Sequence, residues 1–242
     1  MLTWSKILAR RGRFPRDDEG RPYVPGFYLA DALKDAVVFY FVKKDRSLEN
    51  RVRRYLTKEN LDLKVVADRV YDIVFERYPV LGEVKVPDRI YPDPDGIRTV
   101  TVEIFDLRKG YDVDDFRSES FSGVLEIDLN VPDGAMEKIR YAGRSFTEAL
   151  IKMEMGMLED HPLVEEFYQP LINEIREWEI PLRLGKWTTA PHGGRLLFFW
   201  RIKEVRERIK RDYGIDIRPV KVLYLPRDRA TAGWSELRQE EV

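Results

Sequence analysis

The sequence predicts an α+β fold built around an antiparallel sheet, and three observations lead to that class. Two segments, 97–107 and 121–131, alternate apolar and polar residues and are rich in Val and Ile, as half-buried strands are. Segments such as 27–43 carry apolar residues at helical spacing. Because the clear strands are few and consecutive, an antiparallel sheet is favoured over a doubly wound parallel one, and a ferredoxin-like arrangement is the natural candidate.

The N-terminal part is expected to contain an arm followed by helices. Residues 1–22 mix arginines with acidic residues without an apolar period, which indicates an irregular arm. Prolines and a glycine at 22–26 precede a helix over about 27–43. Two helical patterns within about 47–80 predict a helical insertion, and the Pro-, Gly- and Asp-rich stretch 80–96 predicts a connection. The aromatic residues around the first helix, expected to be mostly core, are Tyr23, Phe27, Tyr28, Phe39, Tyr40 and Phe41.

The middle of the chain supplies the two clear strands. Segments 97–107 and 121–131 are expected to pair in antiparallel fashion, joined by the connection 108–120. Since that connection is longer than a tight turn, it predicts a protruding acidic loop with its tip at residues 112–115.

The C-terminal part begins with two helices in series. Residues 134–179 have helical periodicity with a break at His161 and Pro162. Beyond them we expect a strand at 180–184, a glycine-bearing loop, a helix over about 195–213 and a last buried strand at 221–225.

The composition is that of a globular protein. With 242 residues and 43% hydrophobic content the chain can bury a sizeable core. We expect one unit over 1–242, with the helical insertion at about 47–80 and a C-terminal glycine-loop region at about 180–242. Lys and Arg number 42 against 43 Asp and Glu, so the net charge of -1 gives no global sign of a nucleic-acid binder, and any basic surface must be local.

Other features of the composition bear on location and habitat. The absence of cysteine excludes a disulfide framework and thiolate metal sites, and it favours a cytoplasmic location. No apolar run approaches the roughly 18 residues that span a bilayer, and the N-terminus lacks the apolar core of a signal peptide. The 35% of charged residues, with only 4 Asn and 2 Gln, is typical of thermophile proteins with dense surface ion pairs.

The strongest candidate site is the glycine segment, residues 183–195. It combines cations, hydroxyls, glycine backbone N–H groups and one aromatic face, which together suit a sugar-phosphate chain. Its candidate residues are Arg183, Gly185, Lys186, Trp187, Thr188, Thr189, His192, Gly193, Gly194 and Arg195. A solvated turn with Trp187 packed on the core explains the same composition. The segment has neither P-loop nor GxGxxG spacing.

Catalytic and metal sites have weaker support. His192 is a candidate general base for RNA cleavage, although no His, Cys or carboxylate is paired with it in the sequence. His161 precedes a proline at a helix start, where a capping or surface role is ordinary. The acidic residues of the middle segments follow no known metal-binding spacing, so we expect no metal and no cofactor.

Three segments, in order, resemble the repeat-associated RAMP proteins of CRISPR systems. YVPGFYLADALKDAV (23–37) resembles their Y-I-P-G-S-S-L-K-G-A-L-R helix start, and PLRLGKWTTAPHGGR (181–195) resembles their glycine-rich loop. KVLYLPRDRATAGWSEL (221–237) resembles the closing strand, Pro-Arg-x-Arg and Gly-Trp ending of the type III-A (Csm) effector subunit at the crRNA 3′ end. At the helix start, Phe27 and Tyr28 stand where the family has two small hydroxyl residues.

The resemblance implies a fold and a set of contacts. It implies a ferredoxin-like (RRM-like) antiparallel sheet whose glycine loop and Pro-Gly helix start contact the guide-RNA backbone. Pro25, Gly26 and Lys34 carry over from the helix start, and Arg227 and Arg229 would extend the RNA track. The expected partners are single-stranded guide RNA and neighbouring RAMP subunits.

Three functions follow as hypotheses. The first is a non-catalytic guide-RNA-binding subunit of a type III CRISPR ribonucleoprotein, which serves antiviral defence. The second is a metal-independent RAMP endoribonuclease, with His192 as acid or base and Lys186 stabilising the developing charge. The third is a protein scaffold without RNA contact, for which the near-neutral charge is the supporting feature.

Overall fold

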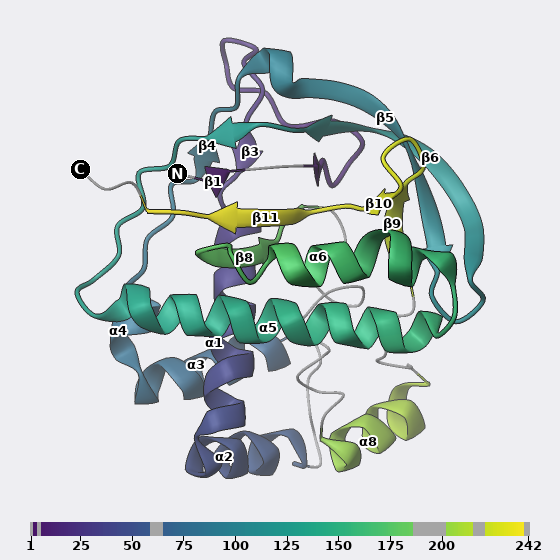
Figure 1. Cartoon of the computed structure of the whole chain (residues 1–242). Helices are drawn as coiled ribbons and strands as arrows, with labels where there is room; N and C mark the ends of the chain where they lie inside the picture. Colours follow the sequence, from purple (N-terminus) through teal and green to yellow (C-terminus); the bar gives the residue numbers. More distant parts are fainter. Residues whose placement is uncertain (1, 4–5, 59–64, 186–201, 215–220, 240–242) are drawn as a thin grey trace.

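The computed structural model describes residues 2–3, 6–58, 65–185, 202–214 and 221–239. Helices and strands intermix along the chain, and all pairings between the described strands are antiparallel. The expected α+β class is therefore confirmed. The sheets occupy the upper half of the molecule in Figure 1, and most of the helices lie below them.

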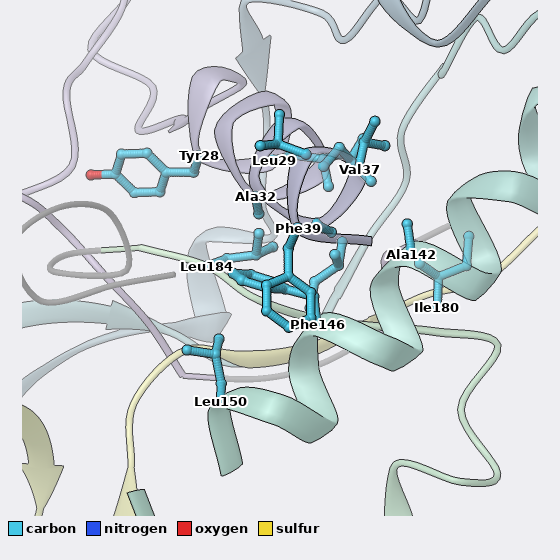
Figure 2. Packing of buried hydrophobic residues seen from close by; sticks show 14 of the residues in the cluster. Tyr28, Leu29, Ala32, Val37, Phe39, Ala142, Phe146, Leu150, Ile180 and Leu184 are labelled. Atoms are coloured by element: carbon cyan, nitrogen blue, oxygen red, sulfur yellow. The ribbon is translucent and has the colours of Figure 1, made fainter. Parts of the chain in front are cut away.

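The core forms where helix α1 (Phe27–Lys44) packs against helix α5 (Ala135–Leu158). α1 is apolar on most of its sides because it lies inside the molecule, and its bounds confirm the expected helix (Figure 2). The rings of Phe39 and Phe146 meet at 5.4 Å between centroids. Tyr28, Phe39 and Phe41 are buried as expected, whereas Phe27 is 45% exposed and Tyr23 and Tyr40 are only half-buried.

Three short helices follow α1 in the segment expected to be a helical insertion. They are α2 (Arg46–Leu56), α3 (Val66–Arg77) and α4 (Pro79–Gly82). The carboxylate of Asp45 caps α2 by accepting the N–H groups of Ser47 at 2.9 Å and Leu48 at 3.1 Å. Helix α8 (Lys203–Tyr213) lies near α2 in Figure 1, and Arg53 and Glu204 join the two through an ion pair of 3.2 Å.

One sheet has the order β7 (Val124–Leu125), β1 (Leu2–Thr3), β11 (Trp234–Leu237) and β8 (Ile180–Arg183). Helix α5 packs on β8 at Gly143, where a Cβ atom would lie 2.8 Å from Ile180 Cγ2. The missing side chain lets the helix approach the strand closely.

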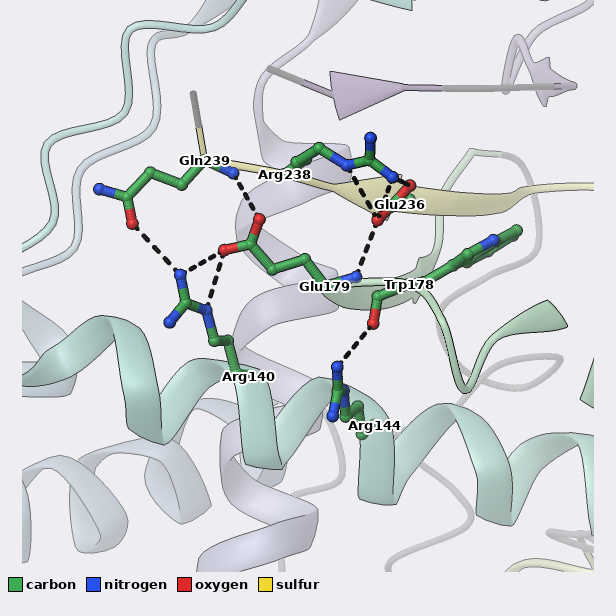
Figure 3. A network of polar contacts seen from close by, with 7 residues as sticks. All are labelled: Arg140, Arg144, Trp178, Glu179, Glu236, Arg238 and Gln239. Carbon is green, nitrogen blue, oxygen red and sulfur yellow. Dashed lines mark hydrogen bonds and ion pairs between the residues drawn. The ribbon is translucent and has the colours of Figure 1, made fainter. Parts of the chain in front are cut away.

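Polar side chains tie α5 to the ends of β8 and β11 (Figure 3). Arg140 Nε donates to Glu179 Oε1 at 2.9 Å, and Arg144 donates to the carbonyl of Trp178 at 3.0 Å. The N–H of Glu179 donates to Glu236 at 2.8 Å. Charged hydrogen bonds as well as packing therefore fix the position of α5 on the sheet.

The second sheet curls on itself. Its order is β10 (Ala230–Thr231), β9 (Lys221–Leu225), β5 (Ile97–Asp106), β6 (Tyr111–Phe121) and β2 (Ile7–Leu8). The N–H of Gly233, just beyond β10, donates to the carbonyl of Lys6, just before β2, at 3.1 Å, so the two edges of this curled sheet meet. A small second core gathers residues from these strands and their ends: Leu8, Val102, Leu223, Leu225 and Ala232.

The β5–β6 hairpin corrects the expected middle of the chain. β5 pairs with β6 along its length, so residues 112–115 lie in a strand and not at a loop tip. The turn takes residues 107–110, where the Asp106 carboxylate accepts the N–H groups of Arg108 and Lys109 and Gly110 adopts φ 72°. Asp has a low intrinsic propensity for strands, but the acidic side chains of β6 are exposed to solvent, so their burial does not disfavour the strand.

Other boundaries also differ from the sequence expectations. The expected strand 121–131 is reduced to Phe121 in β6 and to β7, because Gly123 with φ 148° interrupts it. The N-terminal arm contains β1 and β2, and β10 and β11 follow the strand 221–225 that was expected to be last. These short strands lack a readable alternation, and only pairing with distant strands defines them.

The remaining elements connect these layers. β3 (Val24–Pro25) and β4 (Arg89–Ile90) form a two-stranded ribbon, and a 3-10 turn, Pro94–Gly96, leads into β5. After α5, the ring Nδ1 of His161 accepts the N–H of Leu163 at 3.1 Å, which confirms its capping role. A π-helical turn, Val164–Tyr168, and α6 (Gln169–Glu174) follow. Within the described residues, no helix combines the length and apolarity needed to cross a membrane.

Candidate nucleic-acid interface

A groove of about 400 Å³ opens beside the curled sheet, between the base of the β5–β6 hairpin and the β9–β10 turn. Gly96, one of its lining residues, packs closely against the end of β6: a Cβ atom there would lie 2.6 Å from the ring of Phe121 and 2.8 Å from the carbonyl of Ser122. The lining residues are Lys6, Asp95, Gly96, Arg98, Thr99, Val100, Thr101, Ser120, Ser122, Leu225, Arg227 and Asp228.

The groove has a mixed lining in which cations and hydroxyls stand beside two carboxylates, Asp95 and Asp228, and a few apolar side chains. Lys6 pairs with Asp228 at 2.8 Å. Arg98 and Arg227 are exposed, and neither forms an ion pair with a residue in the described part of the chain. Hydroxyls come from the two strands of the hairpin and the residue after it: Thr99, Thr101, Ser120 and Ser122. Unpaired guanidinium groups beside hydroxyls suit a sugar-phosphate ligand.

Two residues of the sequence-predicted site lie at this groove or beside it. Arg227 lines it. Gly185 has φ +107° and lies so close to β2 that a Cβ atom would be 2.9 Å from the Leu8 nitrogen. Leu8 in turn pairs with Ser120 of the groove lining. The chain therefore leaves β8 for the rest of the glycine segment next to the groove.

Arg183 does not fit the phosphate contact expected for it. The residue is 7% exposed, and its guanidinium forms a buried ion pair with Glu154 of α5. Its Nε donates to the carbonyl of Ala232 at 3.0 Å, and its plane lies 4.5 Å from the ring centroid of Trp234. A buried, paired guanidinium of this kind holds the fold together.

The same buried network explains the Gly-Trp ending. Tyr168 donates to Glu154 at 2.8 Å, and burial, followed by the neighbouring Glu154 carboxylate, raises the pKa of Tyr168 well above its ordinary value. The indole N–H of Trp234 donates to Thr231 at 2.8 Å. Gly233 has φ +95°, and a Cβ atom there would lie 2.3 Å from the carbonyl of Leu184. Gly233 allows the close approach to Leu184, and Trp234 packs in the core beside the buried ion pair.

The helix-start residues lie apart from the groove. Pro25 is buried in the ribbon, and the N–H of Gly26 donates to the Asp88 carbonyl at 2.9 Å. A Cβ atom on Gly26 would lie 1.7 Å from the carbonyl of Pro87, so only glycine fits. Lys34 is exposed and its ammonium lies 6.0 Å from the ring of Tyr71 on α3.

The remaining predicted residues divide into two groups. Arg229 is exposed, has φ 49° and pairs with Glu166 at 3.5 Å. The residues that lie outside the described part of the chain are Lys186, Trp187, Thr188, Thr189, His192, Gly193, Gly194 and Arg195.

Sequence reasoning missed Lys6, Arg98 and the groove hydroxyls. In β5, Thr99 and Thr101 alternate with Val100 and Val102, and Arg98 comes directly before them; this pattern indicates a strand but not a groove. Among the residues that the structure describes, no group of three or more His, Cys, Asp or Glu side chains is placed to hold a metal ion.

The fold is similar to that of Csm subunits of type III CRISPR systems. A chain in the cryo-EM structure of a Csm-crRNA-target RNA ternary complex, from a type III-A CRISPR-Cas system, matches with a TM-score of 0.59 and 16% identity, over 98% of this chain and 78% of that chain. Csm5 of T. onnurineus, solved by crystallography, matches with a TM-score of 0.58 and 14% identity, over 93% and 73% of the two chains. The resemblance noted in the sequence is thus confirmed at the level of a Csm-like fold.

Sequence comparison defines the family more narrowly. No protein-family model matches the chain. An uncharacterized protein of Aquifex aeolicus (strain VF5) is 40% identical over 242 residues, which is 99% of each chain. The chain belongs to the same family as this Aquifex protein.

Proposed function

We propose that this protein is a non-catalytic guide-RNA-binding subunit of a type III CRISPR ribonucleoprotein, packed against other RAMP subunits near the 3′ end of the guide. The observation that carries the proposal is the groove, where Arg98 and Arg227 lie beside hydroxyls in a Csm-like fold and form no ion pair with a residue in the described part of the chain. In this account the curled antiparallel sheet corresponds to the ferredoxin-like unit of the family.

The chemistry of the groove suits an RNA backbone. Arg98 and Arg227 each offer a planar fork of N–H donors that matches phosphate oxygens. Thr99, Thr101 and Ser122 offer hydroxyls to ribose 2′-hydroxyls or phosphates. The pair of Lys6 with Asp228 leaves this part of the rim nearly neutral, so the two arginines supply the attraction.

The glycine segment completes the proposed interface. Gly185 leaves β8 beside the groove, and Lys186, Trp187, Thr188, Thr189, His192, Gly193, Gly194 and Arg195 follow it in the sequence. Their cations and backbone N–H groups would extend the phosphate track that Arg227 begins. The neutral net charge is compatible with this function because the cations are local.

Charge reversal in the groove tests the proposal. Fluorescence anisotropy with a labelled single-stranded RNA should give binding that weakens with salt for the wild-type chain. Arg98→Glu and Arg227→Glu should each weaken binding, and each should reduce the slope of log affinity against log salt by about 0.7, the value for one phosphate contact on a single strand.

Arg69→Glu is the matched control, since Arg69 is an exposed arginine of α3. It should bind as the wild type does. Equal losses from all three variants would indicate a non-specific charge effect and contradict the groove. The same samples on a denaturing gel report cleavage, and cut RNA would instead support the endoribonuclease with His192.

A further inference from the structure

The ribbon formed by β3 and β4 has one buried and one exposed face. Val24 pairs with Ile90, and these two residues are 2% and 3% exposed. The other side of the ribbon brings together Arg21 and Tyr23, which precede β3, with Arg89 and Tyr91 from β4 and its end, and these side chains contact one another. The exposed face of the ribbon therefore carries two tyrosines and two arginines.

These four side chains form a diagonal ladder across the ribbon. The guanidinium of Arg21 lies 4.9 Å from the ring centroid of Tyr91, and that of Arg89 lies 5.2 Å from the ring centroid of Tyr23. The two rings are 6.2 Å apart between centroids, with an interplanar angle of 58°. Cross-strand neighbours and diagonal pairs of this kind hold each other in place.

Hydrogen bonds fix the ladder further. Asp17 binds the guanidinium of Arg21 at 3.0 Å and its backbone N–H at 2.8 Å. Burial opposes ionisation of Asp17, but these contacts and the hydroxyl of Tyr91 outweigh it, so the pKa of Asp17 is lowered from its ordinary value. Glu19 also pairs with Arg21 at 3.2 Å.

The ladder is nevertheless open to solvent. Tyr91 is 44% exposed, and the side chain of Arg21 is 58% exposed. Arg89 is exposed and forms no ion pair with any residue that the structure describes. The face thus offers a preorganised aromatic ring beside an exposed guanidinium, which is itself hydrogen-bonded to Tyr91.

We propose that the Arg21–Tyr91–Tyr23–Arg89 face is a second RNA contact, on which an unpaired base stacks against Tyr91 while Arg89 binds an adjacent phosphate. This site rests on the proposed function and adds to it a recognition of bases by stacking, which the groove does not supply. Aromatic rings and guanidinium planes are the sequence-tolerant platforms for single-stranded nucleic acid.

Connectivity favours RNA over a protein partner as the occupant. Tyr91 is joined to the groove residues Asp95 and Gly96 by the short turn Pro94–Gly96, so the ladder and the groove are neighbours in the chain. The ladder offers planar groups and a cation without exposed aliphatic side chains.

Tyr91→Ala tests the site in the full-length chain. Its affinity for a labelled single-stranded RNA should fall about five-fold or more, the lower end for loss of one stacking ring. Its affinity for an abasic ribose-phosphate strand of the same length should equal that of the wild type, because no base is present to stack. Tyr91→Phe keeps the ring and should bind as the wild type does. Tyr141→Ala removes another exposed tyrosine, which lies on α5 and is 53% exposed, and should have no effect.

The outcomes separate this site from the groove. Unchanged RNA affinity of a folded Tyr91→Ala, together with weakened binding by Arg98→Glu, would overturn the stacking site and leave the proposed function standing. If Tyr91→Ala kept its RNA affinity but no longer assembled into a reconstituted complex, the face would be a protein contact. That result also overturns the stacking site. If the wild-type chain binds no RNA, both proposals fail.

Discussion

Arg183 and Glu154 form an ion pair within the core, and their surroundings show what single residues do in this fold. Both are almost fully buried, at 7% and 1% exposed. The pair joins α5 to β8, and Tyr168 and Trp234 enclose it. A charge in such a place is stable only while its partner remains.

Removing the carboxylate should therefore destabilise the protein strongly. Glu154→Gln leaves the guanidinium of Arg183 buried without a counter-charge, and the free energy of unfolding should fall by about 3–5 kcal/mol. Chemical denaturation measures this change.

Glu148→Gln is the matched control on the same helix. Glu148 pairs with Lys152, and its side chain is 45% exposed, so its replacement should change the unfolding free energy by less than about 1 kcal/mol. The double variant Glu154→Gln with Arg183→Met should recover part of the loss. If Glu154→Gln and Glu148→Gln lowered the free energy of unfolding equally, the assigned role of the buried pair would be contradicted.

At the scale of elements, Asp45 links α1, α2 and α3. Besides capping α2, its carboxylate accepts the hydroxyl of Tyr78 at 3.1 Å and lies 3.5 Å from Arg77 Nε. The N–H of Leu48, first among these contacts, lowers the pKa of Asp45, although burial opposes it. The cap is therefore strongest when the carboxyl group is ionised.

Loss of this cap should be visible and pH-dependent. Asp45→Ala should lower the free energy of unfolding by about 1 kcal/mol near neutral pH. Because the folded pKa lies below the ordinary value of 3.8, the ionised cap stabilises above that value and its contribution is lost as pH falls through the folded pKa.

The difference between wild type and Asp45→Ala should thus narrow in acid, as measured by urea unfolding at several pH values. Asp45→Asn keeps an acceptor without the charge and should lose less stability than Asp45→Ala near neutral pH. A difference that grows in acid would contradict the assigned cap.

Elements with strong local patterns were predictable from sequence, and elements defined by distant partners were not. α1, α5, β5, β8 and β9 follow from helical spacing, alternation or a short apolar run. β1, β2, β10 and β11 are two to four residues long and exist only because they pair with strands far away in the sequence. The sequence did not predict β6 because its acidic residues are typical of a loop.

The candidate site was predictable only in part, for a related reason. Arg227 and the neighbourhood of Gly185 follow from the C-terminal motifs. Lys6 and Arg98 are more than 80 residues from those motifs, and only the curled sheet brings them to one groove. Arg183 was predicted to bind phosphate because the sequence does not show that Glu154, on another element, pairs with it.

At the scale of the whole molecule, the sheets and the short helices lie on different sides. The curled sheet, the ribbon and the groove strands occupy the upper half of Figure 1, whereas α2, α3 and α8 lie below α5. Within the described part of the chain, the residues of the groove and of the ribbon face belong to the upper half, and α1 and α5 pack beneath them.

Photocrosslinking tests the central claim, that RNA lies in the groove, most directly. A single-stranded RNA with 4-thiouridine is irradiated with the full-length protein, and the crosslinked peptides are identified by mass spectrometry. The account predicts crosslinks in peptides that contain residues 95–101 and 225–228, and their loss when Arg98 and Arg227 are both replaced by Glu. Crosslinks confined to α2, α3 and the exposed side of α5 would contradict it.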